Sequence, residues 1–129
     1  MDILAPILIS IIAASTPLLF AAIGELVVEK SGVLNLGVEG MMLGGAVIAF
    51  IISVETGNSA LAIVAGAAMG AMMAGLFAVL TLGLLANQVA TGLALTLFGI
   101  GLSALLGQGY VGTPLTALPK LNIPGLTDI

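Results

Sequence analysis

Asn35 and Glu39 are the polar side chains best placed to do chemistry in this sequence, because they interrupt a long apolar stretch. A helix that begins near Val33 would stack these two side chains on one face, since residues four apart lie one above the other. A carboxylate at the centre of a bilayer costs about 2.5–3.5 kcal/mol, so Glu39 must face protein or water. The pair therefore predicts a polar route through a membrane. The alternative is that Glu39 is interfacial or packs against a neighbouring helix.

A second polar pair, Asn87 and Gln88, separates two apolar stretches later in the chain. Such a pair is typical of a turn at the membrane surface. A role in lining the same route stays open. The candidate substrate-path residues are therefore Asn35, Glu39, Asn87 and Gln88.

The composition excludes a water-soluble domain and most kinds of catalytic site. Of the 129 residues, 60% are hydrophobic and 6% are charged, whereas a soluble domain carries about 25% charged residues. The chain has no Cys and no His, so we expect no catalytic triad, no metal site and no cofactor. Its formal charge of −4 leaves no basic patch for phosphates, which excludes nucleic-acid binding.

The apolar runs predict an all-α, polytopic transmembrane bundle of about four spans, because one spanning helix needs about 20 apolar residues. The positions of the charged residues place the spans at about 3–24, 33–54, 60–82 and 90–108. Pro17 is expected to kink the first span, with Ser15 and Thr16 satisfying the freed backbone groups. The first span has no basic region before it, so we interpret it as a helix that is retained and not as a signal peptide.

Small residues recur at a spacing of four, which lets helix backbones approach closely in lipid. Gly40 and Gly44 form such a pair in the second span, and Gly66 and Gly70 belong to a longer ladder in the third. We expect these four glycines to lie in helix–helix contacts.

Two glycine-containing stretches are similar to nucleotide-binding motifs but lack the context that those motifs require. Residues 24–31 nearly fit a phosphate loop, but Glu29 replaces its second glycine. Residues 107–112 form a complete GxGxxG. Both stretches follow an apolar helix where the motifs follow a strand. We therefore interpret both as helix boundaries.

The run TPLLFAAIGELVVEKSGVLNLGVEGMMLGGA, residues 16–46, resembles the first part of the permease subunits of ABC importers for simple sugars and nucleosides. Those subunits belong with the ribose and branched-chain amino acid permeases. The resemblance continues through LLANQVATGLAL at 84–95 and into YVGTP and IPGLTDI near the end. Family members are more than twice as long and carry a later loop that docks on the ATPase. The resemblance therefore implies that residues 1–129 are the N-terminal part of one transmembrane permease domain, and that the bundle is incomplete.

The resemblance also implies a non-enzymatic transport subunit of the cell membrane, which helps to carry a sugar or a nucleoside. Its partners would be a cytoplasmic ABC ATPase, a second permease subunit in a homo- or heterodimer, an extracytoplasmic substrate-binding protein and the lipid bilayer. Residues 25–31 and the turn at Asn87 would face the cytoplasm. The N-terminus and a loop at 109–129 would lie outside.

Two other classes of membrane protein remain open on the sequence alone. A proton-carrying proteolipid of a rotary ATPase has glycine- and alanine-rich helices with one carboxylate, but that carboxylate lies near the middle of a span, and Glu39 is expected near an end. A self-contained small four-helix proton-coupled transporter, or a pore protein, fits the chain length. The transporter needs an acid in its first span, and residues 3–24 contain none.

Overall fold

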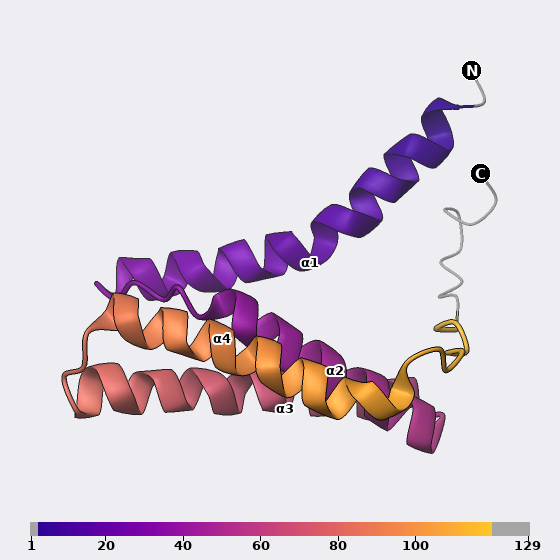
Figure 1. The fold of residues 1–129 in the computed structure, drawn as a ribbon. Helices are drawn as coiled ribbons and strands as arrows, with labels where there is room; N and C mark the ends of the chain where they lie inside the picture. Colours follow the sequence, from indigo (N-terminus) through magenta and orange to yellow (C-terminus); the bar gives the residue numbers. More distant parts are fainter. Residues whose placement is uncertain (1–2, 120–129) are drawn as a thin grey trace.

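The computed structural model describes residues 3–119, and most of them are helical (Figure 1). In chain order the helices are α1 (Leu4–Lys30), α2 (Val38–Thr56), α3 (Ser59–Ala78), the π-helix η1 (Val79–Gly83), α4 (Gln88–Gly107) and the 3₁₀ helix η2 (Gln108–Tyr110). Four helices are long and apolar enough to cross a membrane. The third of them is α3 together with η1, and the fourth is α4 together with η2. No strand occurs within residues 3–119. The prediction of an all-α transmembrane bundle is confirmed.

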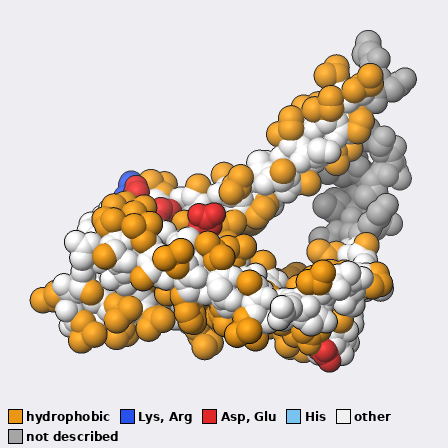
Figure 2. Space-filling view, in the orientation of Figure 1, with side chains coloured by type: hydrophobic (Ala, Val, Ile, Leu, Met, Phe, Trp, Pro, Cys, Tyr) orange, Lys and Arg blue, Asp and Glu red, His pale blue; other side chains and the backbone are white. Residues whose placement is uncertain are grey.

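Helices α2, α3 and α4 run up and down beside one another, and α1 diverges from them towards its N-terminus (Figure 1). The linker 31–37 and the connection 84–87 lie at one end of the bundle, and the turn at 57–58 lies at the other. Figure 2 shows the few charged side chains near the helix ends, on a surface that is otherwise largely hydrophobic. Residues 113–119 have no regular structure, and the remainder of the predicted loop 109–129 lies outside the described residues.

The start of α2 differs from the sequence prediction. Helix α1 continues to Lys30, and Gly32, with φ of +82°, follows its end in a left-handed conformation that suits glycine. Helix α2 then begins only at Val38. The interpretation that a helix starts near Val33 is therefore wrong, and residues 33–37 form a non-helical connection.

Helix α1 has no buried residue. It bends along its length in Figure 1, and Pro17 is the proline within it that would cause a bend. The hydroxyls of Ser15 and Thr16 both donate to the carbonyl of Ile12, at 3.2 and 2.7 Å. A proline leaves unpaired the carbonyl four residues before it, which here belongs to Ala13. The expectation that the two hydroxyls satisfy the freed group is therefore wrong.

Helices α2 and α4 touch through their backbones. A Cβ added to Gly40 would lie 2.5 Å from the carbonyl oxygen of Leu95, and one added to Gly99 would collide with the backbone of Gly40. Both glycines are buried. In lipid, helices associate largely through such close packing, because the surrounding tails are as apolar as the helices. The α2–α4 contact therefore depends on these glycines.

Helices α2 and α3 approach one another almost as closely. A Cβ on Gly66 would lie 2.9 Å from the carbonyl oxygen of Gly45, and one on Gly44 would lie 2.6 Å from the sulfur of Met73. By contrast, nothing lies within 4 Å of a Cβ placed on Gly70, so no helix contact passes through that glycine within the described residues. The buried core cluster is drawn from these three helices and comprises Met41, Met73, Phe77 and Leu95.

Replacing Gly99 by Ala should destabilise the protein, because the new methyl group would meet the backbone of Gly40, which cannot move aside as a side chain can. Overpacking of this kind costs about 1–3 kcal/mol. Gly101→Ala, on the same helix, is the matched control, because nothing lies within 4 Å of its Cβ. Thermal unfolding of the purified protein in detergent should show a lower midpoint for Gly99→Ala only. Equal midpoints for the two variants would contradict the backbone contact.

Candidate functional site

The linker 31–37 contains the first of the predicted site residues, Asn35, which is 7% exposed. The linker backbone lies directly against α4. A Cβ on Gly92 would come within 2.8 Å of the backbone nitrogen of Leu36 and 3.0 Å of that of Gly37. Glycine at position 92 therefore allows the non-helical segment to lie directly against the first turns of α4.

Three consecutive residues of the linker are held by side chains of α1 and α4. The N–H of Leu34 donates to Oε1 of Gln88 at 2.8 Å, and the N–H of Asn35 donates to a carboxylate oxygen of Glu25 at 3.0 Å. The hydroxyl of Thr96 donates to the carbonyl oxygen of Leu36 at 2.9 Å. Backbone groups that leave a helix need other partners, because an unpaired group shielded from water is costly. These bonds therefore let the chain leave the helical conformation here.

The Asn35 side chain then shapes the start of α2. Its Oδ1 accepts the N–H of Gly37 at 2.9 Å, and its Nδ2 lies 3.6 Å from the sulfur of Met41. Such a local bond from an Asn side chain favours a turn over a helix. Asn35 is consequently outside the helix, and the expectation that it stacks with Glu39 on one helical face is wrong.

Glu39 is the second residue of α2 and is exposed. Within residues 3–119 no hydrogen bond joins its carboxylate to another group, in contrast to the polar groups of the linker. A negative charge in the first turn is favourable, because the N-terminal end of a helix carries partial positive charge. Within the described residues, Glu39 therefore presents a carboxylate without a hydrogen-bond partner, close to the linker.

Asn87 and Gln88 have separate roles at the start of α4. Oδ1 of Asn87 accepts the N–H of Ala90 at 3.0 Å, which makes Asn87 the N-cap of α4. Gln88 is the first helical residue and binds the linker through Leu34. The structure thus brings Gln88 to the Asn35 segment, whereas the side chain of Asn87 bonds within its own turn.

Sequence reasoning missed Glu25 and Thr96. The sequence predicts a helix boundary at residues 24–31, which include Glu25, and gives no sign that Glu25 bonds the linker ten residues later. Thr96 lies in an apolar span, but it is four residues after Gly92, which is itself four after Gln88. Residues at this spacing share one helix face, so the stripe of Gln88, Gly92 and Thr96 was the available signal.

The linker also borders a pocket of about 230 Å³ between the end of α1 and the end of α3. Its walls are mainly apolar, and two of its polar residues, Asn35 and Thr81, are buried. The hydroxyl of Thr81 donates to the carbonyl of Phe77 at 2.8 Å. The pocket therefore adds little polar chemistry to the site.

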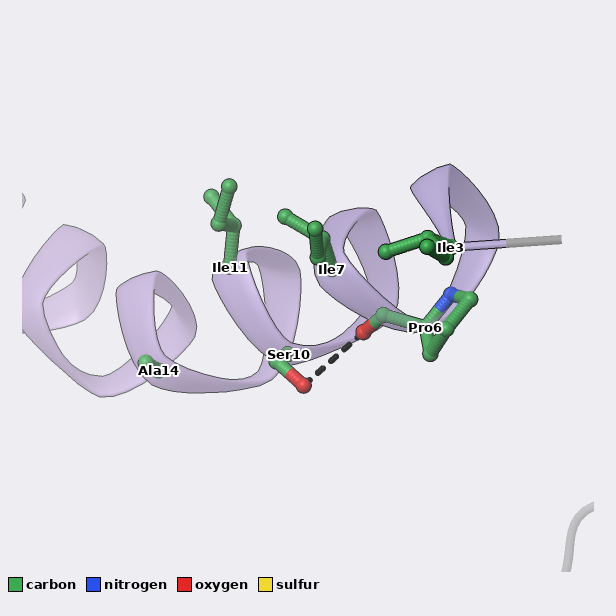
Figure 3. A pocket seen from close by; sticks show the side chains of 6 residues that line it. All are labelled: Ile3, Pro6, Ile7, Ser10, Ile11 and Ala14. Carbon is green, nitrogen blue, oxygen red and sulfur yellow. Dashed lines mark hydrogen bonds between the residues drawn. The ribbon is translucent and has the colours of Figure 1, made fainter. Parts of the chain in front are cut away.

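A second hollow lies on α1 alone, and Figure 3 shows the side chains that line it. Its one hydroxyl, on Ser10, is bonded to the carbonyl of Pro6 at 2.9 Å, as the dashed line marks. Its residues are exposed and belong to the N-cap and the N-terminal half of α1, and they are Ile3, Pro6, Ile7, Ser10, Ile11 and Ala14. It is one face of a single helix and holds no converging polar groups.

At the far end of the bundle, within residues 3–119, one side-chain hydrogen bond joins two helices, and the others lie within the turn at 57–58 and the helix ends beside it. The hydroxyl of Tyr110 donates to a carboxylate oxygen of Glu55 at 2.7 Å, which ties the end of α4 to the end of α2. In the part of the chain that the structure describes, no group of three or more His, Cys, Asp or Glu could hold a metal ion. The polar chemistry is therefore concentrated at the linker.

Comparison with known proteins identifies the family of this chain. The family model described as "Branched-chain amino acid transport system / permease component" matches residues 7–120. The chain belongs to this permease family. With four helices able to span a membrane, it is a multi-pass protein of the plasma membrane. No solved structure matches it significantly.

Three relatives are named as permease proteins of ABC transporters. The chain is 44% identical over 124 residues to the "Putative glucose ABC transporter permease protein TsgC13" of Haloferax volcanii, covering 96% of this chain and 38% of the relative. It is 34% identical to the nucleoside ABC transporter permease protein NupC of Lactococcus lactis, covering 74% of this chain and 32% of the relative. It is 30% identical to the guanosine ABC transporter permease protein NupQ of Bacillus subtilis, covering 99% and 44%.

The chain therefore spans less than half the length of each of these relatives. Relatives that are transport permeases indicate a non-enzymatic chain. Membership of the family also favours the permease interpretation over a proteolipid and over a self-contained small transporter or pore.

Replacing Thr96 by Val should destabilise the permease chain, because the methyl group cannot donate to the Leu36 carbonyl. The bond is an exposed one, and a single hydrogen bond of this kind contributes about 0.5–1.5 kcal/mol. The midpoint of thermal unfolding in detergent should fall for Thr96→Val and be restored by Thr96→Ser. Thr91→Val on the same helix is the control, since no hydrogen bond of the Thr91 hydroxyl occurs within the described residues. A Thr96→Val protein as stable as Thr91→Val would show that the linker does not need this bond.

Proposed function

We propose that this chain forms part of the permease subunit of an ABC importer and lines part of the route by which a sugar or a nucleoside crosses the membrane. The match to the permease family over residues 7–120 carries the proposal. The substrate class follows the relatives, whose names give glucose, nucleosides and guanosine. Four spanning helices with a polar, non-helical linker among them fit a route of this kind.

In this proposal, residues 1–129 are the N-terminal part of a single transmembrane permease domain. A single family model that matches residues 7–120 without interruption supports one domain. The linker 31–37 and the connection 84–87, at one end of the bundle, would face the cytoplasm. The opposite end, with the turn at 57–58, would face outwards.

The proposed partners are those of an ABC importer. A separate cytoplasmic ATPase would hydrolyse ATP, a second permease subunit would complete the route, and an extracytoplasmic binding protein would deliver the substrate. The support is that all three relatives are named as permease proteins of ABC transporters.

The proposed substrate path passes the polar end of α2. Glu39 is the candidate for direct contact, because its carboxylate is exposed and unpaired within the described residues. Sugars and nucleosides carry hydroxyl groups, and an ionised carboxylate can accept hydrogen bonds from them. Asn35, Asn87 and Gln88 would shape the path through the linker and the start of α4.

Replacing Glu39 by Gln in the intact protein, expressed with its transport partners, should lower the uptake of radiolabelled glucose or guanosine. Loss of a charged acceptor for a substrate hydroxyl weakens the interaction by about ten- to a hundredfold. Glu29→Gln is the matched control, because Glu29 is an exposed acid of α1 that has no side-chain hydrogen bond within the described residues.

Two results would contradict different parts of the proposal. Uptake that Glu39→Gln leaves unchanged would remove Glu39 from the path. An unmodified protein, assembled with its partners, that takes up no sugar and no nucleoside would contradict the proposed function itself. The amount of permease in the membrane, measured for each variant, separates a loss of transport from a loss of protein.

A further inference from the structure

Glu25 is a carboxylate in α1, a spanning helix that makes few contacts with the rest of the bundle. It lies within the last two turns of α1, a helix with no buried residue. Within residues 3–119, the other side-chain hydrogen bonds of α1 return to its own backbone, as those of Ser10 and Thr16 do. Glu25 alone reaches beyond the helix, to the N–H of Asn35. A half-buried carboxylate in this position calls for a function.

The bond from Glu25 acts on the middle of the linker. The residues on either side of Asn35 are held from α4, since Gln88 accepts the N–H of Leu34 and Thr96 donates to the carbonyl of Leu36. The Glu25 bond is thus the contact through which α1 fixes the same segment. Together the three bonds constrain successive residues from two sides.

The position of the linker determines where the carboxylate of Glu39 lies. Asn35 accepts the N–H of Gly37, and α2 begins at the next residue, with Glu39 second in the helix. A shift of the Asn35 backbone would therefore be passed to the first turn of α2. The backbone of this turn also packs against α4 at Gly40, whereas the Glu39 side chain has no hydrogen bond of its own within the described residues.

We propose that Glu25 is a positioning residue for transport, which holds the linker at Asn35 so that Glu39 faces the substrate path. This inference rests on the proposed function, because it assumes that the path passes Glu39. What Glu25 supplies is a hydrogen-bond acceptor at the correct distance, and its charge is secondary. The structure offers a precedent for a neutral acceptor, because the amide of Gln88 accepts the neighbouring N–H of Leu34 at 2.8 Å.

Two substitutions separate the acceptor from the charge. Glu25→Gln keeps the length of the side chain and an acceptor oxygen but removes the charge. Glu25→Asp keeps the charge but withdraws the oxygens by about 1.5 Å, one carbon–carbon bond. A positioning role predicts that Gln replaces Glu and Asp does not. A role for charge at the membrane boundary predicts the reverse.

The measurement reports the accessibility of position 39 to a reagent in water, and it does not require transport. A single thiol is introduced by Glu39→Cys into the intact protein in membranes, and these 129 residues contribute no other cysteine. The rate of alkylation by a water-soluble maleimide, per molecule of permease, is compared for Glu25, Glu25→Gln and Glu25→Asp. We expect the Gln variant to match Glu25 within about twofold, and the Asp variant to differ about three- to tenfold, the range that one hydrogen bond supports.

The same pair of substitutions at Glu29 provides the control, and both should leave the rate unchanged, because Glu29 makes no contact with the linker in the hydrogen bonds of the described residues. The proposal is overturned if Glu25→Asp reacts like Glu25, if Glu25→Gln reacts like Glu25→Asp, or if the thiol is unreactive in every background. Uptake of sugar and nucleoside by the unmodified protein, assembled with its partners, is measured separately. The proposed function can therefore stand when this inference fails, and its own failure is recognised independently.

Discussion

The structure depends on satisfying the backbone of one short segment that is not helical. Between α1 and α2 the chain gives up its helical hydrogen bonds at residues 33–37. A backbone group that leaves a helix needs another partner, because an unpaired group shielded from water is costly, so a break of this kind is stabilised where side chains supply the partners. Glu25, Gln88 and Thr96 supply three of them. These three polar side chains therefore have a structural role.

The glycines make this arrangement possible by bringing backbones together. Because Gly92 has no side chain, the linker can lie on α4 close enough for Gln88 and Thr96 to reach it. Gly40 and Gly99 extend the same close approach along α2 and α4. The seam of small residues and the polar linker are thus two parts of one contact. Close packing at Gly92 brings the linker near α4, and the hydrogen bonds from Gln88 and Thr96 form across that short distance.

The sequence was sufficient to predict the helices but not the connection between α1 and α2. The number of helices follows from the length of the apolar runs, because one spanning helix needs about 20 apolar residues. The membrane location follows from the composition, because a soluble domain carries many more charged residues. The start of α2 could not be predicted, because the partners of the linker lie 10 residues before it and 54 residues after it. The rule that residues four apart share a face was applied to Asn35 and Glu39, but it holds only where both are helical.

The glycine ladder of the third span shows the same division between local pattern and tertiary packing. Spacing of four identifies a face on which a neighbour can approach, and at Gly66 a neighbour does approach. At Gly70 the space beside the backbone is open within the described residues. A repeat in the sequence marks every position on a stripe alike, whereas a crossing helix touches the stripe only where the two axes are close.

The lack of buried residues in α1 bears on the order in which the parts of the chain become ordered. A helix in lipid keeps its internal hydrogen bonds whether or not it is docked, so α1 is stable as a spanning segment before it meets the bundle. Helix α1 contributes no residue to the core cluster. Within the described residues, α1 is therefore a unit of local opening with its own small free energy, distinct from cooperative loss of the three-helix core. The side-chain hydrogen bond that docks α1 lies between Glu25 and the linker, at the end of α1 that leads into the bundle.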